Sequence, residues 1–191
     1  MIVIAGGIGS GKSVVARILR LKGYGVFDCD YEAKSLMESD NMVKTEIADI
    51  AGRDIYDIQG RLRRDLLAQR LFSEVHLREK INRCVHRAVR ERIASWAKES
   101  EKNIFVETAI AAESRLAEMA SSIWVVRASE KVRVERVKER DGRNLEQIFR
   151  IIRAQENEEN NLLSSGIPID IIENNPGDDL TKQLDSLLAA I

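Results

Sequence analysis

The sequence predicts an α/β fold in which helices cover a five-stranded parallel sheet. Short apolar runs of strand length alternate with longer helical stretches, a pattern typical of parallel sheets. The first run, residues 1–5 (MIVIA), is continuous and β-branched, as a strand buried on both faces should be. The other four runs are residues 25–28 (GVFD), 104–107 (IFVE), 123–126 (IWVV) and 169–172 (IDII). Such sheets bind ligands at the carboxyl ends of their strands, so functional residues are expected there.

The stretches between these runs are helical by pattern but very unequal in length. Residues 13–21 predict a helix that ends at Gly23. About 75 residues separate the second and third strands, far more than a crossover connection needs. Within them, residues 61–92 carry ten Lys or Arg against four Asp or Glu. Residues 131–155 form a second basic block, with a break expected at Asp141-Gly142.

Composition narrows the class of protein. The 191 residues suit one compact domain, and 44% hydrophobic with 32% charged residues can build a core. The net charge of −1 argues against nucleic acid or an anionic membrane as a partner. No apolar run reaches the roughly 20 residues of a membrane span, and the N-terminus does not resemble a signal peptide.

The two cysteines, Cys29 and Cys84, do not indicate a disulfide framework, so we expect a cytoplasmic protein. Cys84-Val85-His86 could be interpreted as part of a metal site. We reject this interpretation because no second pair of ligands lies near it in the sequence.

The most informative motif is Gly6-Gly7-Ile8-Gly9-Ser10-Gly11-Lys12-Ser13, which fits the phosphate-binding loop G-x-x-x-x-G-K-[ST] at every position. It lies between a predicted strand and a predicted helix, as such a loop should. Its glycines let backbone N–H groups turn toward phosphate oxygens, and the helix presents its positive end to the anion. Lys12 is expected to reach the β- and γ-phosphates of a nucleoside triphosphate as a catalytic residue, and the Ser13 hydroxyl to bind Mg²⁺. The predicted nucleotide-binding residues here are Gly7, Ile8, Gly9, Ser10, Gly11, Lys12, Ser13 and Val14.

Signatures of other nucleotide-binding classes do not occur in the sequence. It contains neither the N-K-x-D guanine motif of GTPases nor the L-S-G-G-Q signature of transport ATPases. A P-loop core with two basic helical insertions is instead the layout expected of a small-molecule kinase. A basic flap that closes over the site can supply cations to phosphoryl transfer and exclude water.

Asp28 and Asp30 follow the second predicted strand directly. In a parallel sheet this place lies beside the phosphate loop, so a carboxylate there could act on an acceptor hydroxyl or on a magnesium-bound water. Alternatively, a carboxylate at this point caps the helix that begins near Tyr31. The residues alone leave both interpretations open.

The motifs together resemble the dephospho-coenzyme A kinase family, whose members are P-loop kinases of the nucleoside monophosphate kinase-like type. The loop Gly6–Ser13 followed by Val26-Phe27-Asp28-Cys29-Asp30 is similar to that family's G-G-I-G-S-G-K-S and V-I-D-A-D segments. The match extends in order and spacing over nearly the whole chain. The further matching segments are Gly60–Arg64, Ile81–His86, Ser129–Gln155 and Ile171–Asn175.

The sequence departs from the family pattern in three places. Arg87 stands where the family usually has proline, residues 108–113 (TAIAAE) replace P-L-L-x-E, and Glu173 replaces an aspartate. These departures leave the phosphate chemistry intact and concern the wall around the acceptor substrate.

The resemblance implies transfer of the γ-phosphoryl group of ATP to the ribose 3′-hydroxyl of dephospho-CoA, the final step of coenzyme A synthesis. Asp30 would be the catalytic base, Asp28 would help hold the metal or the acceptor, Arg140 would be the catalytic lid arginine, and Asn174 would border adenine. The implied domain is a single P-loop kinase domain, residues 1–191. Its core covers about 1–30, 103–128 and 156–191, with a helical acceptor subdomain at about 31–102 and a lid at about 129–155.

Arg133, Arg136 and Arg140 are spaced by three and four residues, so they share one face of a helix. We expect Arg136 and Arg140 to contact the nucleotide and Arg133 to be solvated, as most charged helical residues are. Arg64 and His86 are candidate acceptor-site residues, although a structural hydrogen bond would explain each of them as well.

Two other functions stay open on the residues alone. One is a different small-molecule or nucleoside monophosphate kinase on the same scaffold, and the other is a non-catalytic nucleotide-binding regulator. The sequence does not indicate an oligomeric state.

Overall fold

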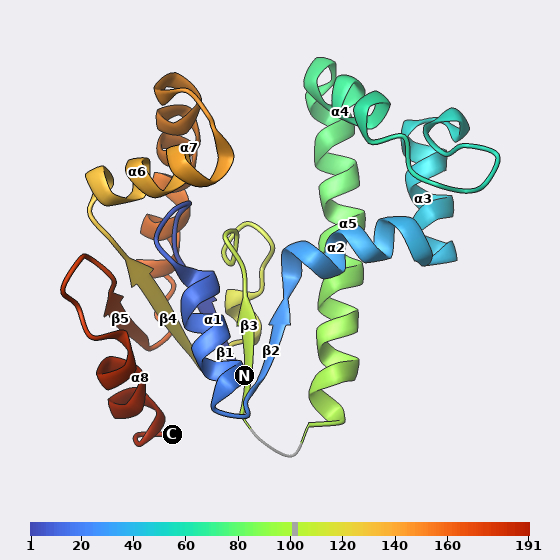
Figure 1. Cartoon of the computed structure of the whole chain (residues 1–191). Coiled ribbons are helices and arrows are strands. Elements are labelled where there is room, and N and C mark those ends of the chain that lie inside the picture. Colours follow the sequence, from blue (N-terminus) through green and yellow to red (C-terminus); the bar gives the residue numbers. More distant parts are fainter. Residues whose placement is uncertain (101–102) are drawn as a thin grey trace. The chain divides into compact units, whose positions relative to one another are not determined.

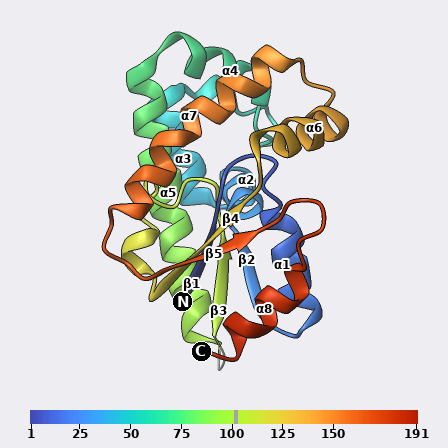
Figure 2. The same cartoon turned by 90° about the vertical axis from the view of Figure 1, so that its left-hand side faces the viewer.

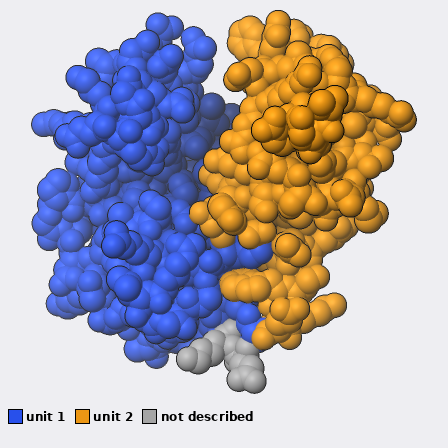
Figure 3. Space-filling view, turned by 45° about the vertical axis from the view of Figure 1, so that its right-hand side comes forward, with its two compact units in different colours: residues 1–27, 100–191 blue, residues 28–99 orange. Residues whose placement is uncertain are grey.

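A computed structural model gives the fold and describes residues 1–100 and 103–191 (Figure 1). The expected end of the helical insertion near residue 102 therefore lies outside the described residues. The chain divides into two compact units, which Figure 3 shows in different colours. Unit 1 comprises Met1–Phe27 and Ser100–Ile191, and unit 2 comprises Asp28–Glu99.

Unit 1 contains the sheet, whose strands are those that the apolar runs predict. The strands are β1 (Ile2–Ala5), β2 (Gly25–Asp28, whose last residue begins unit 2), β3 (Ile104–Glu107), β4 (Ser122–Arg127) and β5 (Ile169–Glu173). The helices are α1 (Lys12–Leu21), the 3₁₀ turn η2 (Ala117–Met119), α6 (Glu130–Asp141), α7 (Leu145–Leu163) and α8 (Leu180–Leu188).

The sheet is five-stranded and parallel, with the order β2-β3-β1-β4-β5, and this confirms the predicted fold class. In register, Val3 of β1 pairs with Val106 of β3 and with Ile123 of β4. All four residues of β1 are buried, because the strand lies in the middle of the sheet. The strand order reverses beside β1, and ligands of open α/β sheets bind beyond the carboxyl ends of the strands at this point.

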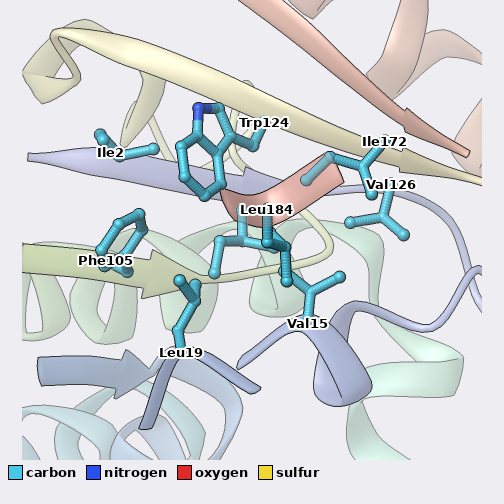
Figure 4. Packing of buried hydrophobic residues seen from close by; sticks show 9 residues of the cluster. Ile2, Val15, Leu19, Phe105, Trp124, Val126, Ile172 and Leu184 are labelled. Atoms are coloured by element: carbon cyan, nitrogen blue, oxygen red, sulfur yellow. The ribbon is translucent and has the colours of Figure 1, made fainter. Parts of the chain in front are cut away.

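The main hydrophobic core lies on the face of the sheet that α1 and α8 cover (Figures 2 and 4). Trp124 of β4 is fully buried at its centre, with its ring centroid 5.1 Å from that of Phe105. Leu19 of α1 and Leu184 of α8 close the core from the helical side, and both are fully buried. The core thereby fixes the position of α1, whose first turn follows the phosphate loop.

Unit 2 is helical. Its elements are α2 (Cys29–Ser39), α3 (Asn41–Ala51), the 3₁₀ turn η1 (Arg53–Ile55), α4 (Arg64–Ser73) and α5 (Val75–Lys98). The long helix α5 packs against α2, α3 and α4. Several of these helices carry fully buried apolar side chains, such as Ile47 of α3 and Ile93 of α5.

Asp40 connects α2 to α3, and its carboxylate accepts hydrogen bonds from the backbone N–H groups of Met42 and Val43. This N-cap explains how two helices follow one another with a single residue between them. Among the described residues, no helix has both the length and the apolarity that a bilayer span requires.

Two leucines on α1 test this account of the core. Leu19 is fully buried, whereas Leu21 is 79% exposed. We expect Leu19→Ala to lower the free energy of unfolding by about 2–5 kcal/mol, because the substitution leaves a cavity beneath the sheet. Leu21→Ala should change it by less than about 0.5 kcal/mol. Urea denaturation of both variants checks this, and equal losses would contradict the assignment of Leu19 to the core.

Candidate active site

The phosphate loop leaves the carboxyl end of β1 and leads into α1, which begins at Lys12. Gly11 is the N-cap of this helix and has a left-handed backbone, with φ at 100°. The first turn of α1 contains Lys12, Ser13 and Val14 and no acidic side chain, so nothing opposes an anion at the positive end of the helix. The loop therefore has the strand–loop–helix context that its sequence predicts.

Asn174, directly after β5, contacts the backbone of the loop. Its side-chain amide donates a hydrogen bond to the Ser10 carbonyl oxygen at 2.7 Å, and its backbone N–H donates to Arg127 O at 2.8 Å. A Cβ atom on Gly11 would lie 2.0 Å from Asn174 Nδ2, so only glycine fits there. Asn174 is buried. The structure thus gives it a structural contact with the loop in addition to its predicted place near adenine.

Lys12 folds back over the loop. Its ammonium group donates a hydrogen bond to the Gly6 carbonyl oxygen at 2.6 Å and a longer one to Gly7 O at 3.4 Å. The positive charge consequently lies directly over the backbone that is expected to receive phosphate oxygens.

Arg136 extends from α6 to the loop. One terminal nitrogen of its guanidinium lies 3.3 Å from Gly9 O and 3.4 Å from Ser10 O, and the other donates to Asn174 O at 2.9 Å. The guanidinium therefore joins three parts of unit 1, namely α6, the loop and the segment after β5. The sequence predicts that Arg136 contacts the nucleotide, and the structure brings its guanidinium to the loop.

The prediction that Arg133 is solvated is wrong. The residue is partly buried, and its Nε donates a hydrogen bond to Ile8 O at 2.9 Å. Burial lowers the pKa of this guanidinium, while the charge of Glu159 opposes the shift. Its place on the same helix face as Arg136 was visible in the sequence. That this face meets the loop was not, because Ile8 lies 125 residues earlier in the chain.

Arg140 lies at the end of α6 and is exposed. Its guanidinium forms two hydrogen bonds with the Asp141 carboxylate, at 2.7 and 3.0 Å, and Arg143 approaches the same carboxylate at 3.3 Å. The hydrogen bond from Arg140 holds the pKa of Asp141 below its ordinary value. Among the described residues Arg140 is not brought to the loop, and its guanidinium is paired with Asp141 instead. The break predicted at Asp141-Gly142 is confirmed, since Gly142 caps α6.

Gln155 on α7 is a contact of the loop that sequence reasoning did not single out. Its side-chain oxygen accepts a hydrogen bond from the Ile8 backbone N–H at 2.7 Å. The only signal in the sequence was its place at the end of the segment that matches the family's lid.

A cavity of about 360 Å³ lies beside the loop within unit 1. Its lining is mostly polar or charged and includes Gly7 and Ser10 of the loop, Arg127 at the end of β4, and Glu159 of α7. The Ser10 hydroxyl is buried and has no hydrogen-bond partner among the described residues. The volume and the lining suit a cavity that receives part of a small polar ligand.

In unit 2, the two predicted carboxylates behave differently. Asp28 caps α2, because its Oδ1 accepts the backbone N–H of Tyr31 at 3.0 Å. Asp30 lies in the first turn of α2 and is exposed, and within the described chain its carboxylate has no hydrogen-bond or ion-pair partner. The structure therefore confirms that Asp28 caps α2. Asp30 is the carboxylate of the two that remains available for a ligand.

Arg64 and His86 also belong to unit 2. Arg64 begins α4 and forms an exposed ion pair with Glu38, with 2.6 Å between Nη2 and Oε1. His86 is partly buried in the middle of α5. The structure gives Arg64 a structural partner, and such an exposed pair contributes little to stability.

The fold and the loop together define a class, the P-loop kinases: a parallel sheet with β1 at its centre, a complete phosphate loop, and basic helices above it. Comparison with known proteins specifies the family. The sequence model of dephospho-CoA kinase matches residues 1–178 of this chain.

Individual relatives agree with this match. A dephospho-CoA kinase from Porphyromonas gingivalis is 38% identical over 157 residues, which cover 82% of this chain and 77% of the relative. The crystal structure of TT1252 from Thermus thermophilus superposes with a TM-score of 0.82 at 30% identity and covers 100% of this chain and 96% of its own. A dephospho-CoA kinase from Campylobacter jejuni has a TM-score of 0.70 at 16% identity, with 99% of this chain and 96% of that chain covered. The last similarity concerns the fold alone.

The chain belongs to the dephospho-CoA kinase family. It is an ATP-dependent kinase of coenzyme A biosynthesis.

A pair of glycine substitutions tests the contact between Asn174 and the loop. Gly11→Ala and Gly23→Ala both place a side chain at a positive φ, and each should lower the free energy of unfolding by about 1–2 kcal/mol. Only the first also displaces Asn174, since nothing lies within 4 Å of a Cβ on Gly23. We expect Gly11→Ala to weaken ADP binding at least about tenfold and Gly23→Ala to leave it unchanged, as measured by calorimetry. Equal affinities in the two variants would contradict this contact.

Proposed function

We propose that the protein transfers the γ-phosphoryl group of ATP to the 3′-hydroxyl of the ribose of dephospho-CoA, which yields CoA and ADP. One observation carries the proposal: a complete phosphate loop is followed, after the next strand, by Asp30, whose exposed carboxylate has no hydrogen-bond or ion-pair partner among the residues that the structure describes. A phosphate-binding donor half and a carboxylate for the acceptor hydroxyl are what phosphoryl transfer to an alcohol requires. The family supplies the name of the acceptor.

On the donor side, the loop from Gly7 to Val14 binds the triphosphate of ATP with its backbone N–H groups other than that of Ile8, which donates to Gln155, and with the positive end of α1. Lys12 exchanges the Gly6 carbonyl for β- and γ-phosphate oxygens. Arg136 is already bonded to loop carbonyls, so a small shift of its guanidinium suffices to reach the nucleotide. Arg140 leaves Asp141 and neutralises charge on the moving phosphoryl group.

Ser13 is the residue that we propose for Mg²⁺. Its hydroxyl is exposed in the first turn of α1 and has no hydrogen-bond partner within the described chain, so it is available as a ligand. Mg²⁺ takes most of its ligands from phosphates and water, so a single hydroxyl is a suitable contribution from the protein. When bound, the ion neutralises charge on the β- and γ-phosphates.

On the acceptor side, Asp30 accepts the proton of the 3′-hydroxyl while that oxygen attacks the γ-phosphorus. The bond from the γ-phosphorus to the β–γ bridging oxygen breaks, and ADP leaves with the electron pair. Asp28 helps to hold the metal or the acceptor in addition to capping α2. Arg64 and His86 contact dephospho-CoA, for which Arg64 must exchange its partner Glu38.

We further propose that the protein works in the cytoplasm. Both cysteines are buried and neither forms a disulfide, and burial raises the pKa of Cys84 to about 11, so it remains an uncharged thiol. Reduced thiols suit a reducing compartment.

An ADP-release assay with ATP, Mg²⁺ and dephospho-CoA tests the reaction, beside a panel of nucleoside monophosphates. We expect turnover with dephospho-CoA and none above background with the panel. Turnover of a nucleotide without turnover of dephospho-CoA would establish a different kinase on this scaffold. Nucleotide binding without transfer to any acceptor would instead support a regulator.

Asp30→Asn tests the base. Loss of the carboxylate should lower kcat by about 10²–10⁴-fold, because the acceptor proton then has no base, while ATP binding stays within about twofold. Asp28→Asn is the matched variant, since asparagine caps a helix as well as aspartate does and the fold should be kept. We expect this variant to lose about tenfold in kcat/KM for dephospho-CoA. Wild-type kcat in Asp30→Asn would show that the base lies elsewhere.

A further inference from the structure

Ile8, in the middle of the phosphate loop, belongs to a second and smaller hydrophobic core. This core consists of Val137 of α6 with Ile148 and Ile152 of α7, all of them buried. The Ile8 side chain packs against it together with Val134. A residue of the nucleotide-binding loop therefore completes the apolar contact between two helices that lie far from it in the sequence.

The backbone of Ile8 is held by the same two helices. Its N–H donates to Gln155 Oε1 of α7 at 2.7 Å, and its carbonyl accepts Nε of Arg133 of α6 at 2.9 Å. The side chain, the donor and the acceptor of one residue are thus all engaged by α6 and α7. We call Ile8, Arg133 and Gln155 the Ile8 clasp.

The glycines beside Ile8 show how closely the clasp surrounds the loop. A Cβ atom on Gly7 would lie 2.3 Å from Arg133 Nη2 and 3.3 Å from Gln155 Oε1. A Cβ on Gly9 would lie 2.6 Å from the backbone oxygen of Arg133. The clasp therefore touches the loop on both sides of Ile8, and these glycines serve contact with α6 and α7 as well as contact with phosphate.

The clasp also determines where the Ile8 peptide groups point. The Ile8 N–H is directed to Gln155, so the phosphates must be bound by other N–H groups of the loop. A partly buried N–H group without a partner costs roughly 1–3 kcal/mol, and a loop that has lost this bond would adopt other conformations. Such a loop has to be ordered when the nucleotide binds, and that ordering reduces affinity.

We propose that Gln155 and Arg133 are positioning residues, which hold the Gly7–Gly9 segment in its phosphate-binding shape and join the loop to α6 and α7. Nucleotide affinity then depends on two helices whose clasp residues need not touch the nucleotide. Because Arg133 is fixed at the loop, it also determines where along the loop α6 presents Arg136 and Arg140, which lie one and two turns further along the helix. The positioning role of these residues rests on the proposed function only for the identity of the nucleotide and of the reaction.

Three variants of α7 test the clasp. Gln155→Met keeps the length of the side chain but removes the acceptor, and Gln155→Glu keeps an acceptor. Asn157→Met removes an exposed amide from the same helix and is the matched control. Each variant is examined for its unfolding midpoint, for hydrogen exchange of the Ile8 amide without nucleotide, and for its Kd for a non-hydrolysable ATP analogue.

In Gln155→Met we expect the Ile8 amide to exchange at least about tenfold faster and the Kd to rise about tenfold, with KM for dephospho-CoA at saturating ATP unchanged. Gln155→Glu should retain slow exchange, and Asn157→Met should equal the wild type in every measurement. Unchanged exchange in Gln155→Met would overturn the clasp. Faster exchange with an unchanged Kd would overturn its positioning role.

These outcomes are separate from the proposed function. If the wild-type protein does not phosphorylate dephospho-CoA, the proposed reaction is wrong. The exchange of the Ile8 amide and the affinity for the analogue still decide on the clasp, because neither measurement involves an acceptor. If Gln155→Met unfolds at a much lower temperature, Arg133→Gln gives a second test, with the same tenfold rise in Kd expected.

Discussion

The structure of unit 1 depends on how closely its other segments approach the backbone of the phosphate loop. Asn174 occupies the space in which Gly11 would carry a Cβ, and the Arg133 backbone does the same at Gly9. Because these positions are glycines, side-chain donors come within hydrogen-bond distance of the loop carbonyl oxygens. A larger residue in place of a glycine would shield those oxygens. Helix α6, the segment after β5 and the end of β1 therefore meet at one place, and the shape of the loop is a property of all three.

The cations around the loop differ in the hydrogen-bond acceptors that they hold in this structure. Lys12 and Arg136 donate to neutral carbonyl oxygens of the loop, whereas Arg140 is paired with the carboxylate of Asp141. A cationic donor gains more from an anionic oxygen than from a neutral carbonyl oxygen, because the opposite charges attract each other. Exchange of carbonyl oxygens for phosphate oxygens is therefore favourable for Lys12 and Arg136. Arg140 is already bonded to an anionic oxygen, so the exchange of that oxygen for a phosphate oxygen would gain less.

Local patterns predicted the strands and the loop, because a buried parallel strand is a continuous apolar run and a phosphate loop is a contiguous motif. The contacts of Arg133 and Gln155 with Ile8 could not be predicted, since they join segments 125 and 147 residues apart. Helix periodicity says which face Arg133 shares with Arg136, but not what packs on that face. For Asp28 the sequence leaves two roles open. The hydrogen bond that its carboxylate accepts from the Tyr31 N–H shows that it caps α2.

Helix α8 lies beyond residue 178, where the match to the family's sequence model ends, yet Leu184 is fully buried against the sheet. Leu180, Leu187 and Leu188 pack around the same core as Trp124. Any segment that forms a helix with an apolar stripe can meet this requirement, so the order of its residues is weakly constrained. The phosphate chemistry of this chain is therefore encoded in a contiguous motif, while the last cover of its core depends on apolar side chains alone, and a domain boundary drawn at residue 178 would leave that core open to water.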